Sequence, residues 1–187
     1  MCKIYGYVRV STIQQKVERQ INNIIGFNGD AIIISEKQSG KDIDNRAEFK
    51  KLLNKVKPGD TIIFDEVSRM SRNADEGFSL YMELLSKGIS LVFLKERHID
   101  TDEYKRRTQK HIEKVSSSNK KMDNLINGIL ELVAEFEQEN LKDNIRLAFE
   151  QAEHERQFLI KRVTEGKATS SKRQGRPEGS CNIKTDK

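Results

Sequence analysis

The sequence has few cysteines and no long apolar run, and both absences narrow the classes of protein that it can encode. Its two cysteines, Cys2 and Cys181, lie near opposite ends of the 187 residues, and no Cys-x-x-Cys pair occurs. This spacing predicts neither a disulfide framework nor a zinc site. The chain contains no run of 18 apolar residues that would span a membrane, and its first residues lack the layout of a signal peptide. We therefore expect a cytoplasmic protein.

The net charge of +5 is concentrated in the C-terminal tail. Residues 161–187 hold eight Lys or Arg and three Asp or Glu, whereas the 26 basic and 26 acidic residues before them cancel. A basic tail on a neutral body is typical of a protein that binds a polyanion at one end, and we expect DNA or RNA. The alternative is a tail that only improves solubility or was added for expression.

Segments of strand length alternate with segments of helical period over the first 98 residues. We expect strands at 3–11, 30–35, 61–66 and 89–94, and helices at 12–27, from 46 to Pro58-Gly59, and at 73–88. This alternation predicts an α/β fold of three layers, with a mostly parallel sheet covered by helices on both faces. Residues 100–121 are charged and rich in serine near their end, and we expect a mobile loop there with one short helix around 103–115.

A long helix is predicted after this loop. Apolar residues recur at steps of three, four or seven from Met122 to Val163, and residues 122–165 contain no proline and one glycine, Gly128. At about 1.5 Å per residue this helix is about 65 Å long and outruns the domain. Its apolar stripe requires a partner, most simply the same helix of a second subunit. The alternative is a helix that breaks near Asn140–Asn144 and folds back.

The segment after Gly166 is polar and basic and contains Gly-Arg-Pro at 175–177. Its composition predicts a flexible tail. An arginine in such a tail can lie in a DNA minor groove, where the negative potential is concentrated. The residues that we expect to contact DNA are Arg162, Lys167, Lys172, Arg173 and Arg176.

The stretch YGYVRVSTIQQ, residues 5–15, places polar side chains on an apolar strand. Because successive strand residues face opposite ways, Tyr7, Arg9 and Ser11 share one face. Ligands of open α/β sheets bind at the carboxyl ends of the strands, so Ser11 stands where a nucleophile would. The alternative is a serine that only caps the next helix. An arginine near a strand end is costly unless it is paired or binds an anion, which favours the functional interpretation.

The segment DEVSRMSRN, residues 65–73, follows the third predicted strand. Arg69 and Arg72 are three apart, so we expect them to share one face at the start of a helix. Arg46 opens the helix after the loop around Gly40. We expect these arginines and Arg9 to converge on Ser11, where guanidinium groups would grip a phosphodiester and stabilise its charge during attack. The alternative for Arg69 and Arg72 is a solvated helix start.

YVRVSTIQQ, together with SRMSR at this distance, resembles the active-site motifs of the serine recombinases, the resolvase/invertase family. The resemblance runs from residue 3 to about 98 and continues in the long helix. It implies a resolvase-like α/β domain, a long dimerisation helix, and a reaction that cuts and rejoins double-stranded DNA without metal or cofactor. In that reaction a serine becomes joined to a 5′-phosphate, within a tetramer of two dimers on synapsed DNA. The resemblance assigns the nucleophile to Ser11, the catalytic arginines to Arg9, Arg46, Arg69 and Arg72, and supporting positions to Tyr7, Gln15, Gln20 and Ser68.

Three features depart from the family pattern. Many members have Asp where this chain has Ser68, so an acid–base role at that position is in doubt, and Asp65 or Glu66 are candidates to replace it. Residues 100–121 resemble an insertion, and the long helix is extended. Only eleven residues follow Arg176, too few for the helix-turn-helix domain that members usually carry there.

We therefore predict a site-specific DNA recombinase of a mobile element, associated with the nucleoid. We expect a catalytic domain at 1–100, a charged insertion at 101–121, an oligomerisation helix at 122–166 and a basic tail at 167–187. One alternative is a non-catalytic DNA-binding relative of the same fold, favoured by Ser68 and the missing reader domain. Another is a serine hydrolase, which requires His98, His111 or His154 beside Ser11, although no Gly-x-Ser-x-Gly motif surrounds that serine.

Overall fold

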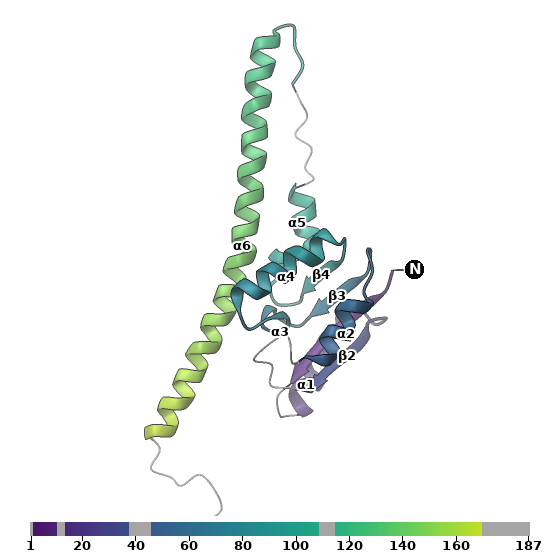
Figure 1. The fold of residues 1–187 in the computed structure, drawn as a ribbon, viewed down its shortest axis with the longest axis vertical. Coiled ribbons are helices and arrows are strands. Elements are labelled where there is room, and N and C mark those ends of the chain that lie inside the picture. Colours follow the sequence, from purple (N-terminus) through teal and green to yellow (C-terminus); the bar gives the residue numbers. More distant parts are fainter. Residues whose placement is uncertain (1, 11–13, 38–45, 109–114, 170–187) are drawn as a thin grey trace, which may run out of the picture. The chain divides into compact units, whose positions relative to one another are not determined.

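The computed structural model describes residues 2–10, 14–37, 46–108 and 115–169 (Figure 1). The strands are β1 (Ile4–Val10), β2 (Ile32–Lys37), β3 (Thr61–Phe64) and β4 (Ser90–Phe93). The helices are α1 (Gln14–Phe27), α2 (Ala47–Lys55), α3 (Val67–Met70), α4 (Ala74–Ser86), the 3₁₀ turn η2 (Arg97–Ile99), α5 (Thr101–Thr108) and α6 (Lys120–Thr169). The chain divides into two units, Met1–Glu153 and His154–Lys187. No helix in the described ranges has the length and apolar character needed to cross a membrane.

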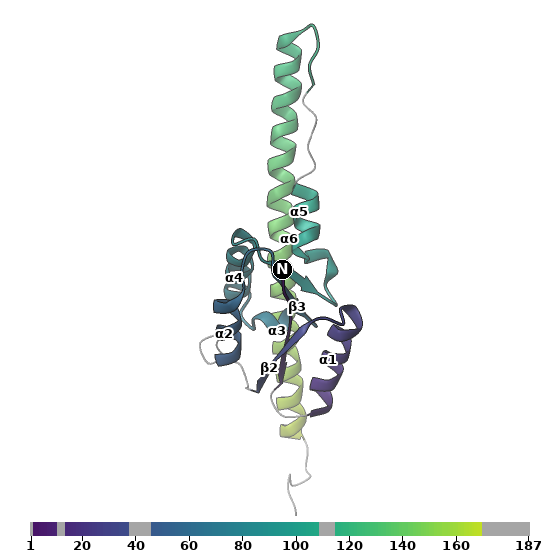
Figure 2. The same cartoon turned by 90° about the vertical axis from the view of Figure 1, so that its right-hand side faces the viewer.

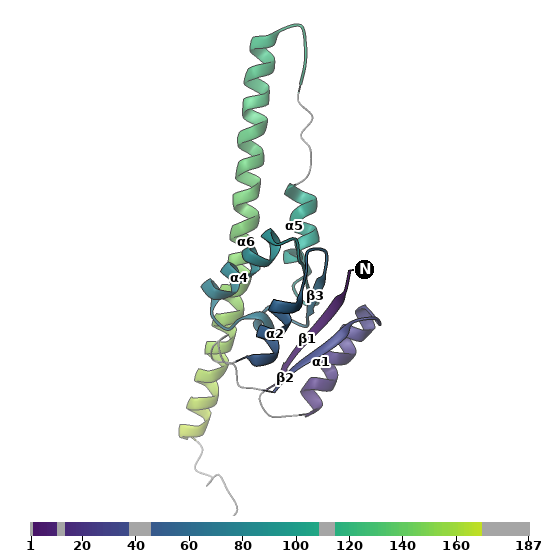
Figure 3. The same cartoon turned by 45° about the vertical axis from the view of Figure 1, so that its right-hand side comes forward.

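The four strands form one sheet in the order β2-β1-β3-β4, and every pairing is parallel. Figure 2 shows α1 on one side of the sheet and α2 with α4 on the other, and Figure 3 shows β1 beside β2. The predicted α/β fold with a parallel sheet between two helical layers is confirmed. Because parallel strands all end at one edge, the segments that follow β1, β3 and β4 meet there.

Alternating strand residues separate two cores. Tyr7, Phe64 and Phe93 face α2 and α4, where the rings of Phe64 and Phe93 stack at 5.3 Å between centroids. Val8 and Ile63 face α1 and pack with Ile24. The larger core therefore lies on the α2 and α4 side, and Arg9, two residues after Tyr7, points to that side as the sequence predicted.

Side chains cover the outer edge of β4, the last strand of the sheet. The backbone N–H of Phe93 donates to Asp100 Oδ1 at 2.8 Å, and the N–H of Leu91 donates to Thr101 Oγ1 at 2.8 Å. Asp100 and Thr101 are both buried. These bonds satisfy donors that an unpaired strand would otherwise leave open.

The charged segment contains a short helix, as predicted, and this helix, α5, starts at Thr101. Acidic residues occupy its first turn and basic residues its last, and Glu103 pairs with both Arg106 and Arg107. This arrangement complements the helix dipole and adds pairs at spacings of three and four. Residues 109–114 lie outside the described ranges.

The helix α6 does not break near Asn140–Asn144, so the folded-back alternative is not adopted. Within the first unit, the buried side chains of α6 include Leu141, Ile145 and Phe149, and Phe149 contacts the ring of Phe93 edge-on. Apolar residues spaced by four place this part of α6 against the core. The division into 1–100, 101–121, 122–166 and 167–187 stays a prediction.

The helices α4 and α6 approach closely at Gly77. A Cβ atom at this position would lie 2.4 Å from Phe149 Cδ1, and Phe149 is itself buried in the core. We predict that Gly77→Ala lowers the free energy of unfolding by about 1–3 kcal/mol, because the ring has to move out of a packed site. Urea denaturation followed by circular dichroism measures the change.

The matched control for this prediction is Gly128→Ala, in an exposed turn of α6 where an added Cβ meets nothing within 4 Å. Alanine there should stabilise by about 0.5–1 kcal/mol through helix propensity alone. If the two substitutions changed the free energy of unfolding equally, the space between Gly77 and Phe149 would not be too small for a methyl group.

Candidate active site

The candidate site lies at the carboxyl edge of the sheet, where β1 and β3 end. Arg9 occupies β1 one residue before its end, and α3 follows β3 with Arg69 on it. Arg46 is the N-cap residue of α2, as the sequence predicted. Ser11, the predicted nucleophile, lies outside the described residues, directly after β1.

Gln20 of α1 holds the end of β1 through the backbone of Arg9. Its Oε1 atom accepts the N–H of Arg9 at 3.3 Å, and its Nε2 atom donates to the carbonyl of Arg9 at 3.4 Å. Gln20 is 1% exposed. A buried amide that bonds both backbone groups of one residue fixes the position of the strand two residues before Ser11.

The four-residue helix α3 is held at both ends by residues distant in sequence. At its C-terminal end, Arg9 Nη2 donates to the carbonyl of Ser68 at 2.7 Å, and Arg46 donates to the carbonyls of Arg69 and Met70 at 3.0 and 2.6 Å. At its other end, the N–H of Val67 donates to a Glu96 carboxylate oxygen at 3.1 Å. Cations at the C-terminus and an anion at the N-terminus complement the dipole of a helix.

A carboxylate on β2 places Arg46. Glu36 Oε2 accepts the N–H groups of Glu48 and Phe49 at 2.9 and 3.1 Å, so it caps α2 from outside the helix. The N-cap residue Arg46 makes no side-chain cap and instead lies over the ring of Phe49, 4.4 Å from its centroid. The guanidinium is therefore free of a capping role and reaches α3.

Four arginines gather at this edge. Burial and, after it, the positive charges of Arg72, Arg46 and Arg69 together lower the pKa of Arg9 to about 10. Arg9 and Arg46 are 4% and 3% exposed, so their charges are held in a poorly solvated place. The Nε atoms of Arg9 and Arg69 are buried and have no hydrogen-bond partner among the described residues. Such a site fits an anion with several oxygens, and phosphate matches the guanidinium fork.

Tyr7 packs under this cluster and is completely buried, with its ring 4.6 Å from that of Phe49. Burial raises the pKa of the Tyr7 phenol to about 12, although the charges of Arg46 and Arg9 act in the opposite direction. The phenol is therefore protonated at neutral pH, which fits the supporting position that the resemblance gives it.

One geometric prediction is wrong. Arg69 and Arg72 do not share a helix face, because α3 ends at Met70 and α4 begins at Ala74. Ser71, between them, has an extended backbone with φ −142° and ψ 159°. Arg72 still belongs to the cluster, since its charge acts on Arg9.

Two acidic residues of the site, Glu36 and Glu96, were not among the residues predicted from the sequence. Glu36 and Glu96 hold α2 and α3, and Glu66 pairs with Arg69 at 2.8 Å and accepts the Ser68 hydroxyl at 2.5 Å. Glu66 was predicted, together with Asp65, as a candidate to replace an acid at position 68. The sequence did hold a signal for these acids: Glu36, Glu66 and Glu96 each lie at or just beyond the end of a strand, as the arginines do.

The remaining predicted residues are outside the described part of the chain, in the second unit, or exposed on η2. Gln15 lies in α1, but its side chain is outside the described part, as is that of Lys167; Lys172, Arg173 and Arg176 also lie outside it. Arg162 is exposed in the second unit, with its guanidinium 5.7 Å from the Phe158 ring centroid. His98 is exposed on η2, His154 is exposed in the second unit, and His111 is outside the described residues.

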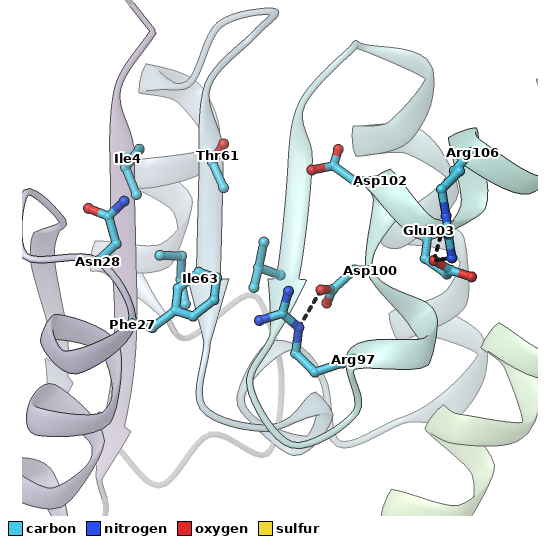
Figure 4. A pocket seen from close by; sticks show the side chains of 11 residues that line it. Ile4, Phe27, Asn28, Thr61, Ile63, Arg97, Asp100, Asp102, Glu103 and Arg106 are labelled. Atoms are coloured by element: carbon cyan, nitrogen blue, oxygen red, sulfur yellow. Dashed lines mark hydrogen bonds and ion pairs between the residues drawn. The ribbon is translucent and has the colours of Figure 1, made fainter.

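A cavity of about 490 Å³ lies elsewhere on the sheet (Figure 4). Its lining includes Ile4 and Thr61, the first residues of β1 and β3, and the ion pair of Arg97 with Asp100. Its position at the first residues of these strands separates it from Arg9, and the candidate site is defined by the charges that converge there. The described residues contain no group of three or more His, Cys, Asp or Glu side chains placed to hold a metal ion.

Comparisons with known proteins agree with this geometry. The chain is 30% identical over 141 residues to the transposon Tn501 resolvase of Pseudomonas aeruginosa, a match that covers 75% of this chain and 65% of that protein. It is 32% identical over 99 residues to a resolvase of Clostridium perfringens, covering 52% of each protein. It is 37% identical over 83 residues to the DNA-invertase hin of Salmonella typhimurium, covering 44% of this chain and 43% of that protein.

The chain thus spans less than two thirds of the length of these relatives. The family described as "Resolvase, N terminal domain" matches residues 4–155, which include all the strands and the four arginines. With this match over most of its length, the chain belongs to the resolvase family of serine recombinases.

Proposed function

We propose that this chain is the catalytic part of a site-specific recombinase that cuts and rejoins double-stranded DNA. The observation that carries the proposal is the cluster of Arg9, Arg46, Arg69 and Arg72 at the strand edge that Ser11 follows. The hydroxyl oxygen of Ser11 attacks a DNA phosphorus and loses its proton, and the bond to the 3′-oxygen breaks. The 3′-oxygen leaves with a proton, and Ser11 holds the 5′-phosphate until a 3′-hydroxyl attacks in reverse.

The arginines supply the electrostatic part of this reaction. Negative charge that builds up on the transferring phosphoryl oxygens is stabilised by cations that are already in place. The buried Nε donors of Arg9 and Arg69 have no hydrogen-bond partner among the described residues, so a phosphoryl oxygen that reached them would satisfy them. Gln20 holds the backbone of Arg9 by two hydrogen bonds and thereby fixes the strand from which Ser11 follows.

We predict that Ser11→Ala abolishes the covalent adduct and leaves DNA affinity nearly unchanged, because only the attacking oxygen is lost. The assay mixes the protein with a pool of nicked duplex oligonucleotides of randomised sequence and looks for an adduct that survives denaturant. Mass spectrometry of the peptide that carries Ser11 identifies the attachment. Ser79→Ala, at an exposed serine of α4, is the control and should behave as the unaltered protein.

An adduct that persists in Ser11→Ala would place the nucleophile elsewhere. DNA binding without any adduct, in the unaltered protein, would favour the non-catalytic relative. The observation that favours this second function is Ser68, which stands where many members carry an acid.

The proposed assembly is a homodimer that forms a tetramer on synapsed DNA. The first half of α6 exposes a stripe of large apolar side chains at alternating steps of three and four, namely Met122, Leu125, Ile129, Leu132 and Phe136, each more than half exposed. This spacing is that of a coiled-coil seam, and burying five such side chains in a second copy stabilises the pair.

We predict that Leu132→Glu shifts the protein towards monomer, because it places a charge at the centre of this seam. Sedimentation equilibrium measures the dissociation constant, which should rise by at least about tenfold, or about 1.4 kcal/mol. Gln138→Glu puts the same charge on the opposite face of α6 and should leave the dissociation constant unchanged. Equal association of the two variants would exclude this seam.

The basic tail is proposed to bind DNA through phosphates, with Arg162, Lys167, Lys172, Arg173 and Arg176 as the contacts. We predict that the logarithm of affinity falls linearly with the logarithm of salt concentration, by about 0.9 per phosphate neutralised. Replacing Lys172, Arg173 and Arg176 together by Gln should make the slope shallower by about 3. Fluorescence anisotropy with a labelled duplex measures both slopes.

The matched control replaces three exposed lysines of the first unit, Lys51, Lys57 and Lys87, by Gln. It removes the same charge without touching the tail, so its slope should equal that of the unaltered protein. A tail variant with an unchanged slope would contradict the assignment.

A further inference from the structure

Glu66, at the N-cap of α3, gathers three donors on one carboxylate. Its Oε1 atom accepts the hydroxyl of Ser68 at 2.5 Å and pairs with Arg69 Nη2 at 2.8 Å. Its Oε2 atom pairs with the ammonium group of Lys95, just beyond β4. The carboxylate therefore links the ends of β3 and β4 to the helix that carries Arg69.

The neighbouring acid, Asp65, does not reach this place. Asp65 is fully buried on the α1 side, where Asn23 Nδ2 donates to its Oδ1 atom at 2.8 Å and Arg19 lies 4.0 Å from its Oδ2 atom. Consecutive residues at a strand end face opposite ways, so Asp65 turns to α1 while Glu66 turns towards α3. Of the two acids that the sequence offered, Glu66 is the one beside Arg69.

The carboxylate of Glu66 is charged at neutral pH. Partial burial acts to raise the pKa of Glu66, but hydrogen bonds from Lys95 and Ser68 and the charge of Arg69 outweigh it and lower the pKa below the ordinary value. A charged acceptor with three donors has little freedom to move. The Glu66 carboxylate restricts Arg69 in turn, because the ion pair at Arg69 Nη2 limits the rotamers that this long side chain can adopt.

We propose that Glu66, with Ser68 as its hydrogen-bonded neighbour, is a positioning residue that holds the Arg69 guanidinium in place for the scissile phosphate. Glu66 engages Nη2, and the Nε donor of Arg69 is buried and has no partner among the described residues. One nitrogen of the guanidinium is thus anchored by Glu66, while its Nε–H still lacks an acceptor among the described residues. This inference rests on the proposed function, because it explains how Arg69, one of the proposed catalytic arginines, is oriented.

A masking role for the contact between Glu66 and Arg69 predicts the opposite effect on the rate of cleavage. If Glu66 only masked Arg69, its removal would release a cation for DNA and speed cleavage. If Glu66 positions Arg69, its removal leaves the charge present but wrongly placed, and misplacement of this kind costs about 10- to 100-fold in rate. The sign of the effect on cleavage therefore separates positioning from masking.

The test compares Glu66→Gln with the unaltered full chain in the nicked-duplex assay, with adduct formation timed at saturating DNA. We expect the rate of adduct formation to fall about 10- to 100-fold, while the DNA dissociation constant stays the same or decreases because a negative charge is gone. Glu83→Gln, which breaks an exposed Glu–Lys pair on α4, is the control and should change neither value. Thermal melting shows whether each variant is folded.

A rescue variant separates positioning from a purely structural role. Ser68 Oγ already touches Glu66 Oε1, so an acid at position 68 reaches the space beside Arg69. The double variant Glu66→Gln/Ser68→Asp should recover most of the lost rate. Recovery of melting temperature without recovery of rate would overturn the proposal.

The remaining outcomes are also decisive. A rate equal to or above that of the unaltered chain in Glu66→Gln would overturn the positioning role while leaving the proposed function intact. Absence of adduct from the unaltered chain, with DNA bound, would remove the proposed function and this inference with it. Loss of rate in Glu66→Gln, rescue by the double variant and unchanged DNA affinity would establish Glu66 as the residue that aims Arg69.

Discussion

The organisation of the site depends on two buried guanidinium groups that bond to the carbonyls of a four-residue helix. Arg9 and Arg46 each carry a full charge at a place that is almost closed to water. Such burial is costly unless polar partners replace the solvent, and the carbonyls at the end of α3 are those partners. A helix of this length has little stability of its own, so the arginines and α3 hold each other in place.

This dependence explains how positive charges are kept close together without DNA. The charges of Arg72, Arg46 and Arg69 all act against the charge of Arg9. Two carboxylates offset part of this repulsion: the charge of Glu36 acts favourably on Arg46, and Glu66 pairs with Arg69 at 2.8 Å. Protein groups thus fix these cations in place, which is the preorganisation that the proposed reaction requires.

Much of the fold could be predicted from the sequence because its signals are local. The period of two in β1 placed Tyr7 and Arg9 on one face, and the alternation of strands and helices gave the parallel sheet. The break between Arg69 and Arg72 could not be predicted, because neither Gly nor Pro marks it. The end of α3 is fixed by Arg9 and Arg46, which lie distant in the sequence. The helix predicted around 103–115 corresponds to α5, which begins at Thr101 and is stabilised by ion pairs of Glu103 and not by an apolar stripe.

The covered edge of β4 matters where several copies of the protein lie close together. Recombination brings several copies of a protein together on one stretch of DNA, where their local concentration far exceeds that in free solution. An open strand edge would then invite strand-to-strand aggregation. Asp100 and Thr101 occupy the N–H groups of Phe93 and Leu91, so growth of the sheet through this edge is blocked. In the proposed reaction, copies held side by side on DNA would thereby be kept from pairing through β4.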